Sequence, residues 1–223
     1  MLQSLKSRGS LQILKSAWAA LSLSIKNVIN EAGFGTFFET LSKHETHEYK
    51  DFQLLLTLAE RFWDTICTFH FPNIGEVMLT PYDFSVNTGL RLGGKRILVN
   101  DFLTSTELKK LLSVMPSRMR SNNVLLSWLC ESIPQCETVA KGARMFMLLF
   151  IGNFLCSDLG STVNLRYLGS LRKIEHLRNY DRGSMAYATL MHFMTQLSRR
   201  SLSSLGGALF VWQVRFGIYC DYM

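Results

Sequence analysis

Apolar and polar residues alternate on both sides of a short turn in the first half of the chain. Phe69 and Phe71 precede the turn Pro72–Gly75, and Val77 follows it. A period of two with Pro and Gly between the runs is typical of two antiparallel strands joined by a turn. The pattern therefore predicts a small β-hairpin.

Helix-forming signals follow the hairpin directly. Thr80 is a favourable N-cap residue, Pro81 suits the first helical position and Asp83 lies in the first turn. Gly89 is expected to end this helix. The hairpin and the capped helix together, residues 68–94, contain polar residues with structural roles and no converging catalytic set.

Elsewhere apolar residues recur every three or four positions, which is the period of an amphipathic helix. Segment 139–156 is the most hydrophobic and is expected to be the central helix. Ser184 is expected to cap the helix that runs to Leu197. The other helices are expected at 11–31, 36–42, 49–64, from Thr104 or Ser105 to 112, from Asn122 or Asn123 to 130, and 205–219. The predicted fold class is mainly α, a single-domain bundle of about eight or nine helices with one small β-hairpin.

The apolar runs 145–156 and 205–220 raise the question of membrane insertion. Both are shorter than the roughly 20 apolar residues that cross a bilayer, and the second contains Gln213 and Arg215. Buried core helices are the better interpretation, and no membrane association is expected.

Positive charge is concentrated in the second half of the chain. The protein has 223 residues, a net charge of +7 and 48% hydrophobic residues. Residues 1–111 contain 12 Lys and Arg against 11 Asp and Glu, whereas residues 112–223 contain 12 against 6. This excess fits an anionic partner such as nucleic acid or an acidic protein surface. The alternative is a basic surface that only keeps the protein soluble.

Cysteine usage indicates a reducing compartment. The five cysteines lack CxxC spacing, so neither a zinc site nor a disulfide framework is expected. The N-terminal ten residues include Lys6 and Arg8 without a following apolar block, so no secretory leader is expected.

No residue pattern supports catalysis, a cofactor or a metal. His44 and His47 form an HxxH pair without a third ligand nearby and are interpreted as solvated loop residues. Lys141 precedes a hydrophobic helix, but no phosphate-binding loop accompanies it as a pyridoxal enzyme would require. Nucleophile elbows and glycine-rich phosphate loops are absent from the sequence.

Basic residues with aromatic residues among them occur between Arg166 and Arg182, and this stretch is the one candidate interaction surface. Its residue types resemble those that bind nucleic acids, although only Arg166 and Lys173 clearly share one helix face. Solvated side chains are the alternative interpretation. The candidate residues are Arg166, Tyr167, Arg172, Lys173, Arg178 and Arg182.

The hairpin–helix stretch TFHFPNIGEVMLTPYDFSVNTGLRLGG resembles the pattern of plant mobile domains. Four downstream stretches also resemble that family in the same order: ARMFMLLFIGNFL, LRYLGSLR, RGSMAYATL and LGGALFVWQ. The resemblance covers about residues 32–216. It implies a plant mobile domain at 32–223, truncated at its C-terminal end or a degenerate copy, with a helix at 1–31 that packs on or precedes it.

The resemblance also implies a function. Members occur in plant transposons and as host nuclear proteins that act in transposon silencing, gene expression and meristem maintenance, with a phosphatase-like protein as partner. The leading hypothesis is a non-enzymatic nuclear interaction domain without a cofactor. The alternatives are a transferase, because the family is also labelled aminotransferase-like, and a module that binds nucleic acid or chromatin.

This chain departs from the family pattern at specific positions. Arg182 stands where the pattern usually has Trp before Gly-Ser. Lys173 stands where an acidic residue is usual, and Ile66-Cys67 replaces Glu-Thr before the hairpin. These departures concern partner surfaces more than the fold.

Overall fold

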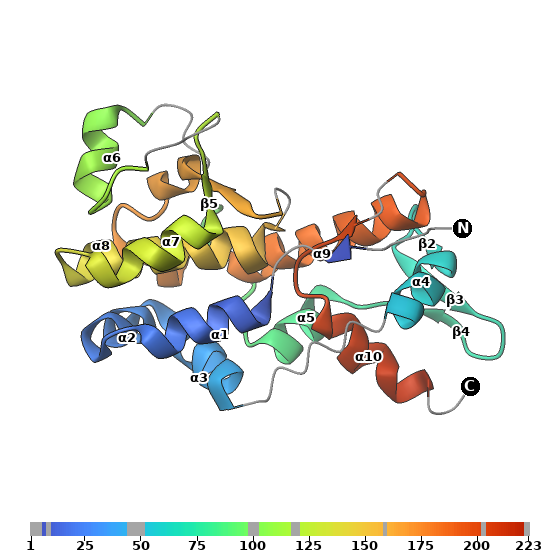
Figure 1. Cartoon of the computed structure of the whole chain (residues 1–223). Coiled ribbons are helices and arrows are strands. Elements are labelled where there is room, and N and C mark those ends of the chain that lie inside the picture. The colour runs from blue at the N-terminus through green and yellow to red at the C-terminus, as the bar shows by residue number, and fades with distance from the viewer. Residues whose placement is uncertain are drawn as a thin grey trace.

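The computed structural model describes residues 6–7, 10–43, 52–97, 103–116, 121–157, 160–201 and 204–220 (Figure 1). The fold is mainly α, as predicted. The α-helices of the described residues are α1 (Leu11–Ala20), α2 (Leu23–Ile29), α3 (Gly35–Lys43), α4 (Phe52–Glu60), α5 (Pro81–Thr88), α6 (Ser105–Leu111), α7 (Leu126–Ser132), α8 (Val139–Phe150), α9 (Arg182–Ser198) and α10 (Phe210–Cys220).

Short helical turns and strands complete the described architecture. The π-helical turns are Asn30–Phe34 and Ile151–Leu155, and the 3₁₀ turns are Ile133–Gln135, Leu165–Gly169 and Ile174–Asn179. The strands are β1 (Lys6–Ser7), β2 (Phe62–Trp63), β3 (Thr68–Phe71), β4 (Gly75–Val77), β5 (Asn123–Leu125), β6 (Thr162–Asn164) and β7 (Ser204–Leu205). They form three small sheets, so the expectation of a single hairpin underestimated the strand content.

Helix α8 is the centre of the fold, as its hydrophobicity predicted. Every residue from Gly142 to Phe150 is buried, and the following π-helical turn continues the buried run. In Figure 1, α1 and α2 lie on one side of α8 and α6 lies on the other. Trp18 of α1 stacks on Phe38 of α3 with ring centroids 4.8 Å apart, and both rings contact Phe146 of α8. Each such fully buried aromatic side chain stabilises the fold by roughly 2–3 kcal/mol.

The predicted helix 11–31 is in fact two helices. The chain is extended at Leu21, which is buried, and the Ser22 hydroxyl accepts a hydrogen bond from Ile25 N as the N-cap of α2. A serine that caps a new helix makes this break favourable within an otherwise continuous apolar pattern. Gly33 has φ +86° at the kink that leads into α3. Residues before and after position 31 share one hydrophobic core. The division into a helix at 1–31 and a domain at 32–223 stays a prediction.

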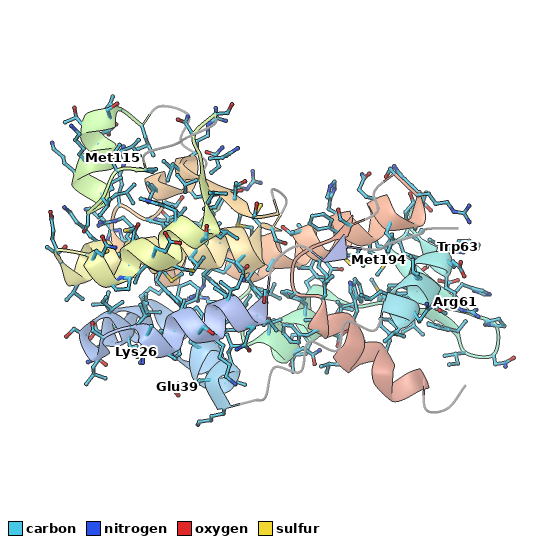
Figure 2. All side chains as sticks on the ribbon, viewed as in Figure 1. Lys26, Glu39, Arg61, Trp63, Met115 and Met194 are labelled. Carbon is cyan, nitrogen blue, oxygen red and sulfur yellow. The ribbon has the colours of Figure 1, made fainter. Side chains whose placement is uncertain are left out.

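The predicted hairpin is confirmed, and a third strand extends it. Phe69 pairs with Val77 across β3 and β4, whereas Phe62 of β2 pairs with Phe69 on the other side. The predicted helix 49–64 was therefore too long, because Phe62 and Trp63 gain backbone partners in the sheet. Residues 44–51, which include His44 and His47, lie outside the described residues. Figure 2 places Trp63 and Arg61 at the end of the molecule that carries this sheet.

The helix start after the hairpin is confirmed in detail. The Thr80 hydroxyl accepts a hydrogen bond from Asp83 N at 3.1 Å, and the Asp83 carboxylate accepts one from Thr80 N at 3.0 Å. Gly89 ends α5 with φ +68°. The same reciprocal cap joins Thr104 and Glu107, so Thr104 rather than Ser105 is the N-cap of α6.

The helix predicted from Asn122 or Asn123 begins later, at Leu126. Asn123–Leu125 is strand β5, which pairs antiparallel with β6. The pairing partner lies about forty residues downstream, so no local pattern signals it. Gly152 of the π-helical turn permits this close packing, because a Cβ there would lie 2.4 Å from the Val163 Cβ.

Two further helix starts differ from the prediction. Asp181, not Ser184, caps α9, and its carboxylate accepts a hydrogen bond from Ser184 N at 3.0 Å. The last helix begins at Phe210 instead of Leu205, because Ser204 and Leu205 pair with β1 and Gly207 has φ +81°. Among the described residues, no helix has the length and apolarity needed to cross a bilayer.

Candidate interaction surface

The six residues of the predicted interaction surface do not lie on one exposed face. Arg172, Lys173 and Arg178 are exposed, and Arg166 is half-buried. Tyr167 and Arg182 are 9% and 4% exposed, so these two are corrections to the predicted surface. Three basic residues of the set are therefore exposed, and a contact of any of the six with a partner stays a prediction.

Tyr167 is buried because its 3₁₀ turn packs against α8. Its hydroxyl donates a hydrogen bond to the Cys156 Sγ at 3.1 Å. Tyr180, the second aromatic residue of the stretch, is half-buried against the hydrophobic core. Bases of a single-stranded nucleic acid require exposed rings for stacking, and Tyr167 does not offer one.

Arg182 is buried without an acidic partner among the described residues. Its guanidinium lies 4.1 Å from the centroid of the Phe34 ring, and Nη1 donates hydrogen bonds to the Ala32 and Gly33 carbonyl oxygens at 3.4 and 3.2 Å. Burial, followed by the positive charge of Arg91, lowers the pKa of Arg182 to about 10.

A cavity of about 590 Å³ lies between α2, the start of α8 and the 3₁₀ turn Ile174–Asn179. Two of the predicted residues, Arg172 and Arg178, line it. The remaining lining residues are Val28, Glu31, Ala140, Arg144, Ile174 and Glu175. Basic and acidic side chains therefore share one cavity.

Arg144 lines this cavity but has a structural role. It is 8% exposed, and its guanidinium donates to three backbone carbonyl oxygens: Leu171 at 2.9 Å, Leu111 at 2.9 Å and Arg172 at 3.2 Å. These hydrogen bonds connect the end of α6 and residues 171–172 to α8. Desolvation lowers the pKa of Arg144, and the Glu175 carboxylate partly opposes that effect.

Arg172 is tied to a neighbouring helix. Its Nη2 lies 2.6 Å from the Glu107 Oε1 of α6. The pKa of Glu107 is lowered, mainly by its hydrogen bonds to Thr104 and secondarily by Arg172. Because this ion pair satisfies Arg172, the charges that remain available at the cavity are those of Arg178, Glu31 and Glu175.

The structure adds a second basic segment that sequence reasoning missed. Lys95 N donates to the Asn179 carbonyl and Asp181 N donates to the Lys95 carbonyl, each at 2.7 Å. Gly183 N donates to the Arg91 carbonyl at 2.9 Å. Gly94 allows the contact, because it has φ +125° and a Cβ there would lie 2.4 Å from the Asn179 oxygen.

This pairing brings the basic segment 91–96 beside the end of the basic segment 173–178. We call the exposed cations of these two segments the cationic surface; its members are Arg91, Lys95, Arg96, Lys173 and Arg178. Among the described residues, none of the five forms an ion pair. The only hint in the sequence was the Gly93-Gly94 pair flanked by basic residues, and such a pair does not identify its neighbour.

The catalytic candidates do not come together. The Lys141 Nζ lies 2.7 Å from the Oε2 of Glu137, an exposed residue just before α8, so this lysine takes part in an ion pair at the surface. In the described part of the chain, no group of three His, Cys, Asp or Glu side chains could hold a metal ion. Cys67, Cys130, Cys136 and Cys156 are free thiols, and burial raises the pKa of Cys130 and Cys136.

These features define a helical domain with a mixed-charge cavity beside a cationic surface. The chain belongs to the family described as Domain of unknown function (DUF8566), whose model matches residues 7–213. No solved structure matches the chain.

Three relatives from Arabidopsis thaliana are similar to the chain. It is 27% identical to Protein MAIN-LIKE 1, over 84% of this chain and 38% of that protein. It is 27% identical to Protein MAINTENANCE OF MERISTEMS, over 83% of this chain and 40% of that protein. It is 28% identical to Serine/threonine-protein phosphatase 7 long form homolog, over 74% of this chain and 13% of that protein. The chain thus spans less than half the length of these relatives, and the first two support the resemblance to plant mobile domains.

Proposed function

We propose that this domain is a non-enzymatic protein-interaction module of the nucleus. By homology with MAINTENANCE OF MERISTEMS and MAIN-LIKE 1, its cellular role is meristem maintenance and the related control of gene expression and transposon silencing. Its partner is a phosphatase-type protein, as the resemblance to plant mobile domains implies. A transposon origin of the domain belongs to the same proposal.

The observation that carries this proposal is the cationic surface next to the mixed-charge cavity. Its exposed cations come from two segments whose backbones are held together by hydrogen bonds. Fixed charges of one sign select an acidic partner surface and accelerate encounter with it. Arg178 belongs to both features and therefore marks their boundary.

A protein partner fits this surface better than a nucleic acid. Glu31 and Glu175 line the cavity next to Arg178, and carboxylates repel a phosphate backbone. Tyr167 is buried, so the aromatic stacking that single strands use is missing at this position. A protein segment with both acidic and basic side chains can pair with the cationic surface and with the carboxylates of the cavity.

The alternative of a transferase finds less support. Lys141 is paired with Glu137 at the exposed beginning of α8 and does not lie in a pocket with converging polar groups. The matched relatives named for meristem maintenance are not named as enzymes, and the phosphatase-named relative matches over only 13% of its length. An absorbance spectrum of purified protein tests the alternative, because a bound cofactor that absorbs near visible wavelengths and disappears in Lys141→Ala would contradict the proposal.

The direct test is an equilibrium titration of the purified chain against a purified plant phosphatase-type protein. The variant Lys95→Glu/Arg96→Glu/Arg178→Glu should bind about tenfold more weakly or worse, because it reverses three charges at the interface. The control Lys43→Glu changes an exposed cation of α3 and should leave the affinity unchanged. Equal affinity of the triple variant and the parent would refute the assigned surface.

A parallel titration with duplex DNA separates the remaining alternative. Direct nucleic-acid binding predicts an affinity that falls steeply as salt concentration rises. We expect DNA binding to be weak at physiological salt and the phosphatase-type protein to bind under the same conditions. The reverse result would replace the protein partner by nucleic acid.

A further inference from the structure

We propose that the partner segment at the cationic surface is an extended acidic peptide, which pairs with the backbone of Arg96 as an added β-strand. This inference rests on the proposed function for its assignment of the cationic surface. It adds the conformation and the charge of the bound segment. A backbone edge without partners and the cations beside it carry the inference.

The backbone of Lys95 fixes the direction of this edge. Lys95 forms a parallel β-bridge with Tyr180. Its N–H donates to the Asn179 carbonyl and its carbonyl accepts from Asp181 N, each at 2.7 Å, so both backbone groups of Lys95 face segment 179–181. In an extended chain the backbone groups of successive residues point to opposite edges. The N–H and C=O groups of Arg96 therefore point to the other edge.

The second edge is unpaired in the described part of the chain. No described residue forms a hydrogen bond with the backbone of Arg96, and Arg96 is exposed. The residues on either side hold it in place, because Lys95 belongs to the bridge and the half-buried Ile97 packs against the hydrophobic core. Unpaired N–H and C=O groups on a chain that is held in this way are a template for an added strand.

The glycines before Lys95 leave room beside the edge. Gly93 is exposed, and a Cβ on it would meet no atom within 4 Å. A Cβ on Gly94 would instead lie 2.4 Å from the Asn179 oxygen, on the side of the bridge. Neither residue therefore places a side chain where a second backbone would approach.

The charges along the edge select carboxylates. Arg91, Lys95 and Arg96 are exposed, and among the described residues none of them forms an ion pair. The carboxylates of Glu31 and Glu175 line the neighbouring cavity, whose lining includes none of these three cations. Like charges without partners favour a segment of the opposite charge. The edge therefore fits acidic side chains on an extended backbone.

A peptide satisfies this edge better than DNA does. The Arg96 N–H needs an acceptor, and the Arg96 carbonyl needs a donor. A peptide backbone supplies both groups at each residue, whereas the phosphodiester backbone of DNA supplies acceptors alone. Binding by strand addition gives the main-chain hydrogen bonds, and the acidic side chains give the selectivity.

Fluorescence anisotropy with labelled peptides tests strand addition. The probe is a peptide of about ten residues in which glutamate and valine alternate, and its lysine–valine counterpart is the charge control. Two further forms are methylated either at all glutamate nitrogens or at all valine nitrogens, which blocks one edge or the other. We expect one methylated form to bind about tenfold more weakly or worse and the other to bind within about twofold of the parent peptide, because only one edge pairs with Arg96.

Two substitutions on the protein provide the matching comparison. Arg96→Ala removes the charge and keeps the backbone N–H, whereas Arg96→Pro removes both and remains compatible with an extended chain. Arg96→Pro should therefore bind the glutamate–valine peptide about fivefold more weakly than Arg96→Ala. Circular dichroism checks that both variants fold. The two methylated peptides keep the test decisive if Arg96→Pro does not.

The outcomes separate strand addition from the proposed function. The proposal is overturned if the parent protein does not bind the glutamate–valine peptide, or if both methylated forms bind equally and Arg96→Pro matches Arg96→Ala. In the latter case, weaker binding to Lys95→Glu/Arg96→Glu/Arg178→Glu would still support the cationic surface. Edge-selective peptide binding without binding to a phosphatase-type protein would support the strand site and refute that partner. An oligothymidylate of similar length that displaces the labelled peptide at lower concentration than unlabelled peptide would assign the surface to nucleic acid and overturn the proposal.

Discussion

Replacing Arg182 by tryptophan should stabilise the protein. Folding lowers the pKa of Arg182 from the ordinary value of an arginine to about 10, mainly through burial. At 1.36 kcal/mol per pKa unit, the charged form costs the native state about 3 kcal/mol at neutral pH. Tryptophan removes the buried charge and keeps a planar group against Phe34.

The substitution also removes favourable contacts. Two hydrogen bonds to the carbonyl oxygens of Ala32 and Gly33 are lost, each worth about 1 kcal/mol. Stacking of the new ring on Phe34 adds about 1 kcal/mol, which replaces the similar contribution of the lost contact between the guanidinium and Phe34. The net gain should be about 1 kcal/mol, which corresponds to a rise in melting temperature of roughly 2–4 °C for a chain of this size.

Urea unfolding followed by tryptophan fluorescence and circular dichroism measures this gain. The cost of the buried charge is fully present below the folded-state pKa of about 10 and is relieved as pH rises toward the higher pKa of the unfolded state. The advantage of Arg182→Trp should therefore shrink by about 1 kcal/mol between pH 8 and pH 11. Arg182→Met, which keeps the length of the side chain without its charge, should show the same dependence on pH.

The opposite result would refute the reasoning about Arg182. If Arg182→Trp and Arg182→Met both lower the free energy of unfolding, the guanidinium is a net stabilising group. A constant difference between pH 8 and pH 11 would likewise show that burial does not perturb its ionisation.

Three further substitutions test other parts of the structure, each measured by urea unfolding. Arg144→Met should cost about 3–5 kcal/mol, because three carbonyl oxygens lose their charged donor, and a loss below 1 kcal/mol would contradict its fastening role. Thr80→Ala should cost about 1 kcal/mol. The pKa of Asp83 is lowered mainly by Thr80, so the part of this loss that depends on the Asp83 carboxylate is present above pH 3.8 and disappears as pH falls through the folded-state pKa. The hydrogen bond from Asp83 N to the Thr80 hydroxyl remains, so the loss should be smaller at pH 2 than at pH 7, and equal losses would contradict the reasoning. Gly152→Ala should lower the free energy of unfolding by about 2 kcal/mol despite the higher helix propensity of alanine, because the new Cβ meets Val163. A higher free energy of unfolding would show that β6 can shift to accommodate the methyl group.

The sequence predicted those features whose physical cause is local. The cap formed by Thr80 and Asp83 requires residues three positions apart, and the hairpin requires alternation around one turn. The burial of α8 follows from its own composition. These signals are complete within a few residues, so tertiary structure did not alter them.

The errors arose where distant segments supply the decisive contact. Asn123 begins a strand because β6 pairs with it, and the local pattern equally allowed a helix. The Ser22 cap interrupts a regular apolar pattern that α1 and α2 share. Hydrophobic periodicity reports which face is buried but not where a helix stops and restarts.

The candidate site was predictable only in its charge. A basic second half indicated Lys173 and Arg178, which are exposed, but composition could not distinguish them from Arg182, which is buried. Arg91 and Lys95 joined the surface through backbone hydrogen bonds to residues about 85–90 positions away. No spacing rule in a single sequence encodes such a contact.

The most direct measurement of the proposed function is carboxyl-to-amine cross-linking of the purified chain with a phosphatase-type partner, followed by mass spectrometry. This chemistry joins lysines to carboxylates that touch them in the complex. The account predicts that cross-links from acidic residues of the partner concentrate at Lys95 and Lys173, that the control Lys43 gives none, and that Lys95→Glu/Arg96→Glu/Arg178→Glu removes them. Cross-links at Lys43 that persist in the triple variant, with none at Lys95 or Lys173, would contradict it.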